Sequence, residues 1–156
     1  MLKKLGVFLL LILMLINIIA CEDKKYVNIH TGYPWATERI ITESLNDNKD
    51  ISLSIIDDSD LSNKARLSIK NNSSENIWFG SKYSLQIVVN NEWHNILITK
   101  ADFTTEQISV EPENEIEFEV DWSQIYGELP TGVYRIIKEY DIGQTTSFVY
   151  CTFTVL

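Results

Sequence analysis

The chain has 156 residues, of which 45% are hydrophobic and 22% are charged, a composition ordinary for one globular domain. Its formal net charge is -9, so the phosphates of DNA or RNA would repel it, and a nucleic-acid partner is excluded. Three prolines and six glycines are too few for long disordered linkers.

The N-terminus has the pattern of a secretion signal. Lys3 and Lys4 give it a positive start, and the run from Leu5 to Ala20 is apolar apart from one asparagine. A membrane-spanning helix needs about 20 apolar residues, so this shorter run fits the apolar core of a signal peptide better. The sequence therefore predicts export, with residues 1–20 as the signal peptide.

A candidate lipid attachment site follows the signal. The residues Ile18, Ile19, Ala20 and Cys21 resemble the lipobox of bacterial lipoproteins, although that family usually has leucine and a small residue in place of the two isoleucines. The resemblance implies that Cys21 becomes the mature N-terminus and carries acyl chains such as palmitate on its sulfur. The protein would then be held on the extracytoplasmic side of the cell membrane. An uncleaved anchor with an incidental cysteine is the alternative.

Residues 21–50 are expected to form the lipidated N-terminus, a tether and a lead-in to the folded domain. The apolar residues Tyr33 to Trp35 are expected to pack against that domain. A short helix is expected from Thr37 to Leu45, because its isoleucines and leucine fall near one face and Thr37 can cap it.

Strand patterns dominate from Ile51 to the last residue. Nine runs are expected to form strands: Ile51–Ile55, Ala65–Lys70, Ile77–Phe79, Tyr83–Val89, Trp93–Ile98, Gln107–Val110, Glu115–Trp122, Val133–Tyr140 and Thr146–Val155. Asn90 and Asn91 suit a two-residue hairpin turn, because asparagine tolerates positive φ. Turn signals between the runs include one at Asp141 to Gly143. An all-β, antiparallel sandwich of seven to nine strands is therefore predicted over residues 51–156.

An acidic pattern marks the run before the last two strands. Acidic residues recur at every second position, at Glu113, Glu115, Glu117, Glu119 and Asp121. In a strand these side chains share one face, so we expect a negative stripe, compensated in part by Arg135 or Lys138 on the adjoining strand. The stripe is either a solvated sheet face or a docking surface for a basic partner.

The segment between the acidic run and the next strand carries the most distinctive motif. Leu129, Pro130, Gly132 and Tyr134 resemble the corner of immunoglobulin-like sandwiches, in which a tyrosine hydroxyl bonds to nearby backbone. Leu129, Gly132 and Tyr134 are therefore predicted to form a structural corner.

Other short motifs extend this resemblance over residues 51–156. They are Leu67-x-Ile69-x-Asn71, Trp78-Phe79-Gly80 with Tyr83, Asn91-Glu92-Trp93, Asp121-Trp122, Tyr126-Gly127 and Tyr134-Arg135. Together with the corner, they resemble a bacterial immunoglobulin-like domain found in small lipoproteins and envelope-associated proteins of Firmicutes-type bacteria. The resemblance implies an extracytoplasmic β-sandwich. It implies no catalytic residue for this chain.

Residues suited to catalysis or metal binding are sparse. The histidines, His30 and His94, are far apart in sequence, and both are expected at the surface. Cys151 is expected to be a small buried apolar residue. The run from Asp57 to Asp60 could offer oxygens to calcium, but it lacks the glycine and later glutamate of a calcium loop and is expected to be a polar turn. No catalytic residue, metal site or cofactor is predicted.

These observations favour a lipid-anchored, non-catalytic interaction or accessory module at the cell envelope. Its expected partners are the membrane, through the Cys21 lipid, and a protein or other envelope component. Two alternatives stay open: a small envelope enzyme or metal-binding protein, and a partner of a membrane-bound sensor or peptidase.

Overall fold

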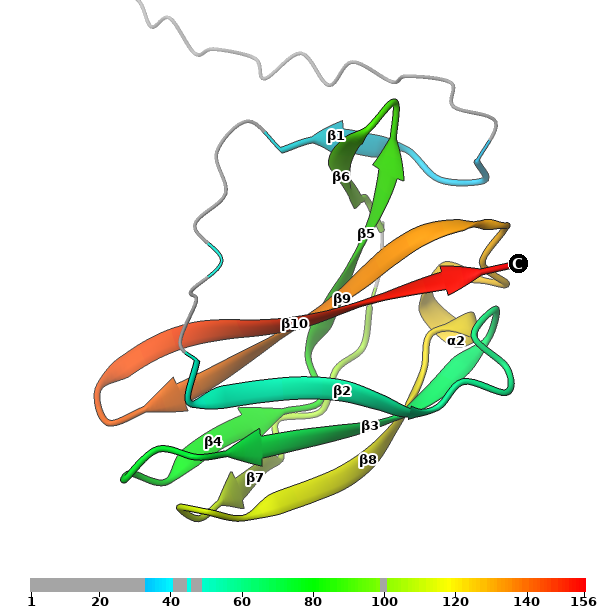
Figure 1. Ribbon diagram of the computed structural model, residues 1–156. Coiled ribbons are helices and arrows are strands. Elements are labelled where there is room, and N and C mark those ends of the chain that lie inside the picture. Colours follow the sequence, from blue (N-terminus) through cyan, green and yellow to red (C-terminus); the bar gives the residue numbers. More distant parts are fainter. Residues whose placement is uncertain (1–32, 41–44, 46–48, 99–100) are drawn as a thin grey trace, which may run out of the picture.

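The computed structural model describes residues 33–40, 45, 49–98 and 101–156, which form an antiparallel β-sandwich (Figure 1). The predicted all-β architecture is confirmed. The elements are β1 (Thr37–Arg39), β2 (Ile51–Asp57), β3 (Lys64–Asn71), β4 (Ile77–Gly80), β5 (Tyr83–Val89), β6 (Glu92–Ile96), β7 (Gln107–Val110), β8 (Glu115–Asp121), α2 (Ser123–Tyr126), β9 (Gly132–Ile142) and β10 (Thr145–Val155).

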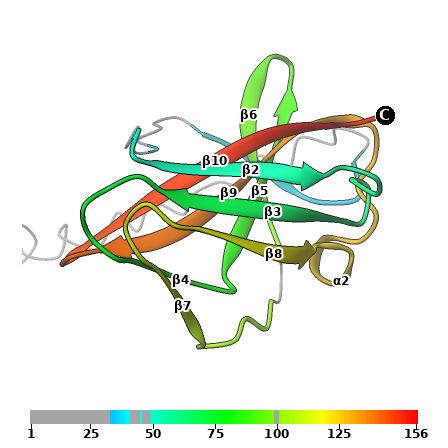
Figure 2. The ribbon, with the colours of Figure 1, turned by 60° about the horizontal axis from the view of Figure 1, so that its bottom comes forward.

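Strand β9 organises the larger of the two sheets. It pairs with β10 along its whole length, and on its other side β5 and then β4 pair with successive parts of it. Beyond β5 lie β6 and β1, and beyond β4 lies β7. The smaller sheet has the order β2-β3-β8. In both views the smaller sheet lies beside β9 and β10, and the tip of the β5–β6 hairpin projects beyond β9 and β10 on the other side (Figures 1 and 2).

The core lies between the inner faces of the two sheets. Alternate residues of each strand point inward, so period-two apolar patterns give each sheet one buried face. Fully buried aliphatic residues come from both sheets and include Leu67, Ile69, Leu85, Ile87 and Ile136. Burying one such side chain stabilises the fold by about 1.5–3 kcal/mol. The Asn90-Asn91 hairpin forms as predicted, with φ values of 52° and 66°.

The predicted corner lies where the chain passes from the smaller sheet to the larger one. The Tyr134 hydroxyl donates a hydrogen bond to the Pro130 carbonyl oxygen at 2.7 Å, and burial raises the pKa of that hydroxyl, so it stays protonated. A Cβ on Gly132 would lie 3.1 Å from the Tyr134 ring, which explains the glycine. Leu129 is buried beside them.

An aromatic stack joins this corner to the last strand. The Phe153 ring lies between Trp122 and Tyr134, with ring centroids 5.1 Å and 5.6 Å away. The one-turn helix α2 follows Trp122, whose carbonyl oxygen accepts a hydrogen bond from the Tyr126 N–H at 2.8 Å. The sequence did not predict α2, because a single turn is too short to show a helical period.

Two local predictions are wrong. Thr37–Arg39 belong to a strand and not to a helix, because they pair with β6, with Thr37 opposite Ile96. This pairing overrides a weak helical pattern; residues 41–44 lie outside the described part of the chain. The turn expected at Asp141 to Gly143 is shorter, because β9 continues to Ile142, which pairs with Ile77.

The predicted signal peptide and Cys21 also lie outside the described residues. Tyr33 and Trp35 of the lead-in are partly buried against the core, as expected. Among the residues that the structure describes, no helix has the length and apolar character needed to cross a membrane.

The corner hydrogen bond can be tested by removing one oxygen atom. Tyr134→Phe should lower the free energy of unfolding by about 1 kcal/mol, because it leaves the Pro130 carbonyl without its donor. Tyr134→Ala should lower the free energy of unfolding by about 3 kcal/mol or more, since it also removes the buried ring and leaves a cavity. Urea denaturation followed by fluorescence measures both.

Tyr140→Phe is the matched control. The Tyr140 hydroxyl is buried and has no hydrogen-bond partner within the described part of the chain. Its removal should leave the denaturation midpoint unchanged or raise it. Equal midpoints for Tyr134→Phe and Tyr140→Phe would show that the corner bond does not stabilise the fold.

Candidate functional site

The predicted acidic stripe lies on the outer face of β8, an edge strand of the smaller sheet. The exposed acidic side chains of this strand are Glu115, Glu117, Glu119 and Asp121. Glu113 does not continue the strand, because it lies in the turn before β8 with a φ of 60°. The period-two pattern therefore holds for four of the five predicted acids.

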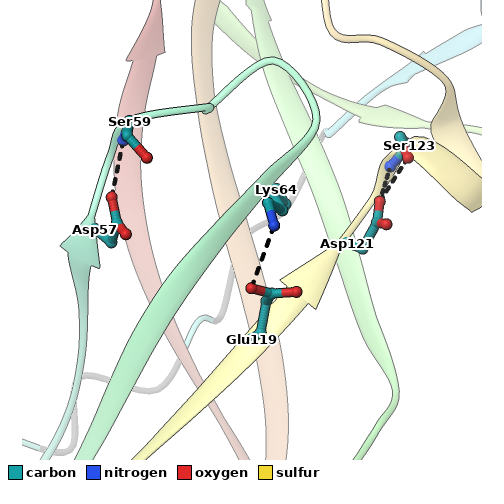
Figure 3. A network of polar contacts seen from close by, with 6 residues as sticks. All are labelled: Asp57, Ser59, Lys64, Glu119, Asp121 and Ser123. Atoms are coloured by element: carbon teal, nitrogen blue, oxygen red, sulfur yellow. Dashed lines mark hydrogen bonds and ion pairs between the residues drawn. The ribbon is translucent and has the colours of Figure 1, made fainter.

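Strand β3, and not β9, compensates these charges. The Lys64 Nζ lies 3.5 Å from a carboxylate oxygen of Glu119 (Figure 3). The Arg66 Nε lies 4.0 Å from a carboxylate oxygen of Glu117. The expected pairing with Arg135 or Lys138 is wrong, because both belong to the other sheet and are buried. Such exposed ion pairs contribute about 0–1 kcal/mol each, so this face is a solvated surface of mixed charge.

The turn from Asp57 to Asp60 adjoins this face. The Asp57 carboxylate accepts a hydrogen bond from the Ser59 N–H at 3.1 Å, which lowers the pKa of Asp57 (Figure 3). Asp60 accepts one from the Asn63 side chain at 2.8 Å. These bonds fix a polar turn, and no group of three or more His, Cys, Asp or Glu that could hold a metal is found among the described residues.

A buried lysine lies between the sheets. Lys138 is 1% exposed, and its ammonium donates hydrogen bonds to the carbonyl oxygens of Gly80 at 2.5 Å and Lys82 at 2.9 Å. Its Nζ also lies 5.3 Å and 5.5 Å from the ring centroids of Phe79 and Phe118. Burial lowers the pKa of Lys138 to about 8. The side chain thus joins β9 to the backbone between β4 and β5.

A cavity of about 340 Å³ adjoins this lysine. Its lining includes aromatic side chains and carboxylates. The aromatic residues are Phe79, Tyr83, Phe103 and Phe118, and the acidic residues are Asp102, Glu106, Glu119 and Asp121. Two of the three donors of the Lys138 ammonium already bind carbonyl oxygens. The arrangement fixes the end of β4 and the start of β5, and the lysine acts as a structural cation.

The outer face of the larger sheet carries aromatic side chains around one arginine, in contrast to the charged face of β8 and β3. The Arg135 guanidinium lies 4.2 Å from the Trp93 ring centroid and 5.3 Å from that of Tyr150, and its Nε donates to Gln86. Phe148 is exposed beside them. Arg135 itself is buried, so the side chains that this face offers to a partner are aromatic; tryptophan and tyrosine are among the residue types that dominate binding energy at protein interfaces. The sequence does not predict this cluster, because its members lie on two hairpins, β5–β6 and β9–β10, that are far apart in the chain.

The histidines and Cys151 do not come together in one site among the described residues. His94 is 2% exposed, so its predicted place at the surface is wrong: it pairs with Ile87 on the buried side of β6. His30 lies outside the described residues. Cys151 was expected to be buried and is partly buried against the core. Desolvation raises the pKa of Cys151 to about 12, so its thiol stays protonated and behaves as a small apolar side chain.

Comparison with known families supports the resemblance noted in the sequence. A family model described as a bacterial Ig-like domain matches residues 46–152. The chain belongs to this bacterial Ig-like family. Bacterial Ig-like domains are generally non-catalytic, and they are often extracellular or surface-exposed. A comparison with curated proteins finds no match to the chain.

The buried lysine gives this bacterial Ig-like domain a pH dependence that can be measured. The pKa of Lys138 is about 8 in the folded protein, whereas an exposed lysine has an ordinary pKa of 10.5, so between these pH values the unfolded chain binds more protons. The wild type should therefore gain stability relative to Lys138→Met as the pH rises from about 8 to 10.5, by up to about 3 kcal/mol.

Urea denaturation of both proteins across this pH range measures the difference. Cys151 and the buried tyrosines titrate in both proteins, so their contributions cancel in the comparison. Stability curves that stay parallel from pH 7 to 11 would contradict a depressed pKa at Lys138.

Proposed function

We propose that the protein is a lipid-anchored, extracytoplasmic Ig-like module that binds other components of the cell envelope and carries out no catalysis. The observation that carries the proposal is the cluster on the outer face of the larger sheet. There Phe148 and Tyr150 are exposed, and the buried guanidinium of Arg135 lies against the rings of Trp93 and Tyr150 and supports them from within. A surface of this composition supplies affinity through burial of rigid aromatic side chains.

The anchor is supported by the order of features at the N-terminus. Two lysines, an apolar run and Ala20 precede Cys21, as in bacterial lipoproteins. Each acyl methylene buried in a membrane contributes about 0.8 kcal/mol, so acyl chains would hold the domain at the membrane surface. Binding would then be confined to components of the extracytoplasmic side, including membrane-bound sensors or peptidases.

Anchoring is tested at the cysteine itself. Cys21→Ser removes the sulfur that accepts the acyl chain, so a cell grown with radioactive or alkyne-labelled palmitate should incorporate no label into the variant. Unprocessed protein should accumulate. Cys151→Ser is the matched control and should be labelled like the wild type. Labelling of Cys21→Ser at the wild-type level would disprove lipidation at this residue.

The mixed-charge face of β8 and β3 offers a second docking surface, for a basic partner. Electrostatic attraction mainly raises the association rate and weakens with salt. If a partner docks here, a triple change to glutamine should slow its association and flatten the salt dependence. The residues to change are Glu115, Glu117 and Glu119. Surface plasmon resonance with a partner recovered by crosslinking measures both effects.

A control must remove the same charge elsewhere. Glutamine replaces three exposed acids outside β8, namely Glu75, Glu111 and Glu128. Equal association rates for the two triple variants would show that the acidic residues of β8 take no specific part in docking.

A further inference from the structure

The sandwich is open where β7 and β8 border it. Ile108 of β7 lies opposite Phe79, so both side chains share the inner face of the larger sheet, yet Ile108 is 41% exposed and Phe79 is 2% exposed. On β8, Ile116 and Phe118 point to the same side as the buried Val120 but are only partly buried. Apolar side chains that face the core are therefore accessible to solvent between these two strands.

The cavity of about 340 Å³ that adjoins the buried lysine occupies this opening. Ile108 and Phe118 line it together with Tyr83 and Phe103. The Phe103 ring meets that of Tyr83 edge to face, with centroids 5.4 Å apart, and the Tyr83 hydroxyl donates a hydrogen bond to the Asp121 carbonyl oxygen at 3.3 Å. A cavity of this size suits a small organic molecule, whose apolar body would be enclosed by these rings.

The charges that line the cavity differ between its solvent-exposed mouth and its inner end. Glu106, which precedes β7, and Asp121, which ends β8, are exposed, and neither is in an ion pair within the described part of the chain. Glu119 is also exposed and is paired with Lys64. Lys138, in contrast, is 1% exposed. A ligand's positive charge is therefore attracted at the mouth and repelled at the inner end.

We propose that this cavity binds a small organic cation, an amine whose charged group stays at the mouth beside Glu106 and Asp121 and whose apolar body enters between the sheets. Only a ligand of this kind uses both features of the site. A metal ion gains nothing from the aromatic lining, and an anion is repelled by the carboxylates at the mouth. The edges and faces of the aromatic rings enclose the apolar body, and their faces also attract an ammonium group.

The test compares three ligands that share one ring and differ in charge. At neutral pH benzylamine is a cation, benzyl alcohol is neutral and benzoate is an anion. Each is titrated into full-length protein in lipid nanodiscs and followed by saturation-transfer NMR, with empty nanodiscs as the blank. Benzylamine should bind about fivefold or more tightly than benzyl alcohol, and benzoate should bind more weakly than either.

A double variant tests the role of the two carboxylates. Glu106→Gln with Asp121→Asn removes both charges and keeps the side-chain oxygen that accepts the hydrogen bonds of Ser123. Benzylamine should then bind about fivefold more weakly, whereas benzyl alcohol should bind as before. Glu111→Gln with Glu128→Gln is the matched control, because it removes the same charge at exposed positions outside the cavity lining. It should bind benzylamine like the wild type.

Ile108→Trp tests the place of binding, because the larger side chain fills the cavity and should abolish binding of benzylamine and of benzyl alcohol. Denaturation midpoints verify that every variant is folded, and the two double variants decide if Ile108→Trp is not. A wild type that binds no benzylamine, tighter binding of benzyl alcohol or benzoate, or equal affinities of the two double variants would overturn the proposal. The site lies apart from the aromatic cluster around Arg135 and from Cys21, so its failure leaves the proposed function untouched.

Discussion

The stack of Trp122, Phe153 and Tyr134 is the contact on which the rest of the sandwich depends. Trp122 directly follows β8, the last strand of the smaller sheet. Tyr134 and Phe153 lie on β9 and β10 of the larger sheet. The hydroxyl bond from Tyr134 to Pro130 then fixes where β9 begins. Because β10, β5 and β4 all pair with β9, the register of the larger sheet follows from this one corner.

Two cations three residues apart on β9 have different surroundings. Alternation along the strand turns Arg135 to the outer face, where it lies over aromatic rings, and Lys138 to the core, where it binds two carbonyl oxygens. Lys138 shares its alternation along the strand with Tyr134, Ile136 and Tyr140, which predicts from the sequence that its side chain faces the core. Neither cation compensates the acidic strand β8, although β8 and β9 follow each other in the sequence, because the two strands belong to different sheets. The chain changes sheets between β8 and β9.

Local patterns predicted the strands and the corner well, because alternation and turn residues act within a few positions. They could not predict β1, whose strand conformation depends on β6 more than 50 residues later. The buried position of His94 and the cluster around Arg135 likewise depend on pairings between distant segments. The candidate interaction surface was therefore largely hidden in the sequence, whereas the candidate lipid site is wholly local.

The stack of Trp122, Phe153 and Tyr134 should therefore hold not only the corner but every strand that pairs with β9. Hydrogen–deuterium exchange of the wild type and of Phe153→Leu tests this most directly, since it reports on backbone amides strand by strand. Amides of β9, β5 and β4 should lose protection in the variant together with those of β10. Loss of protection confined to β10, the strand that carries Phe153, would contradict this account.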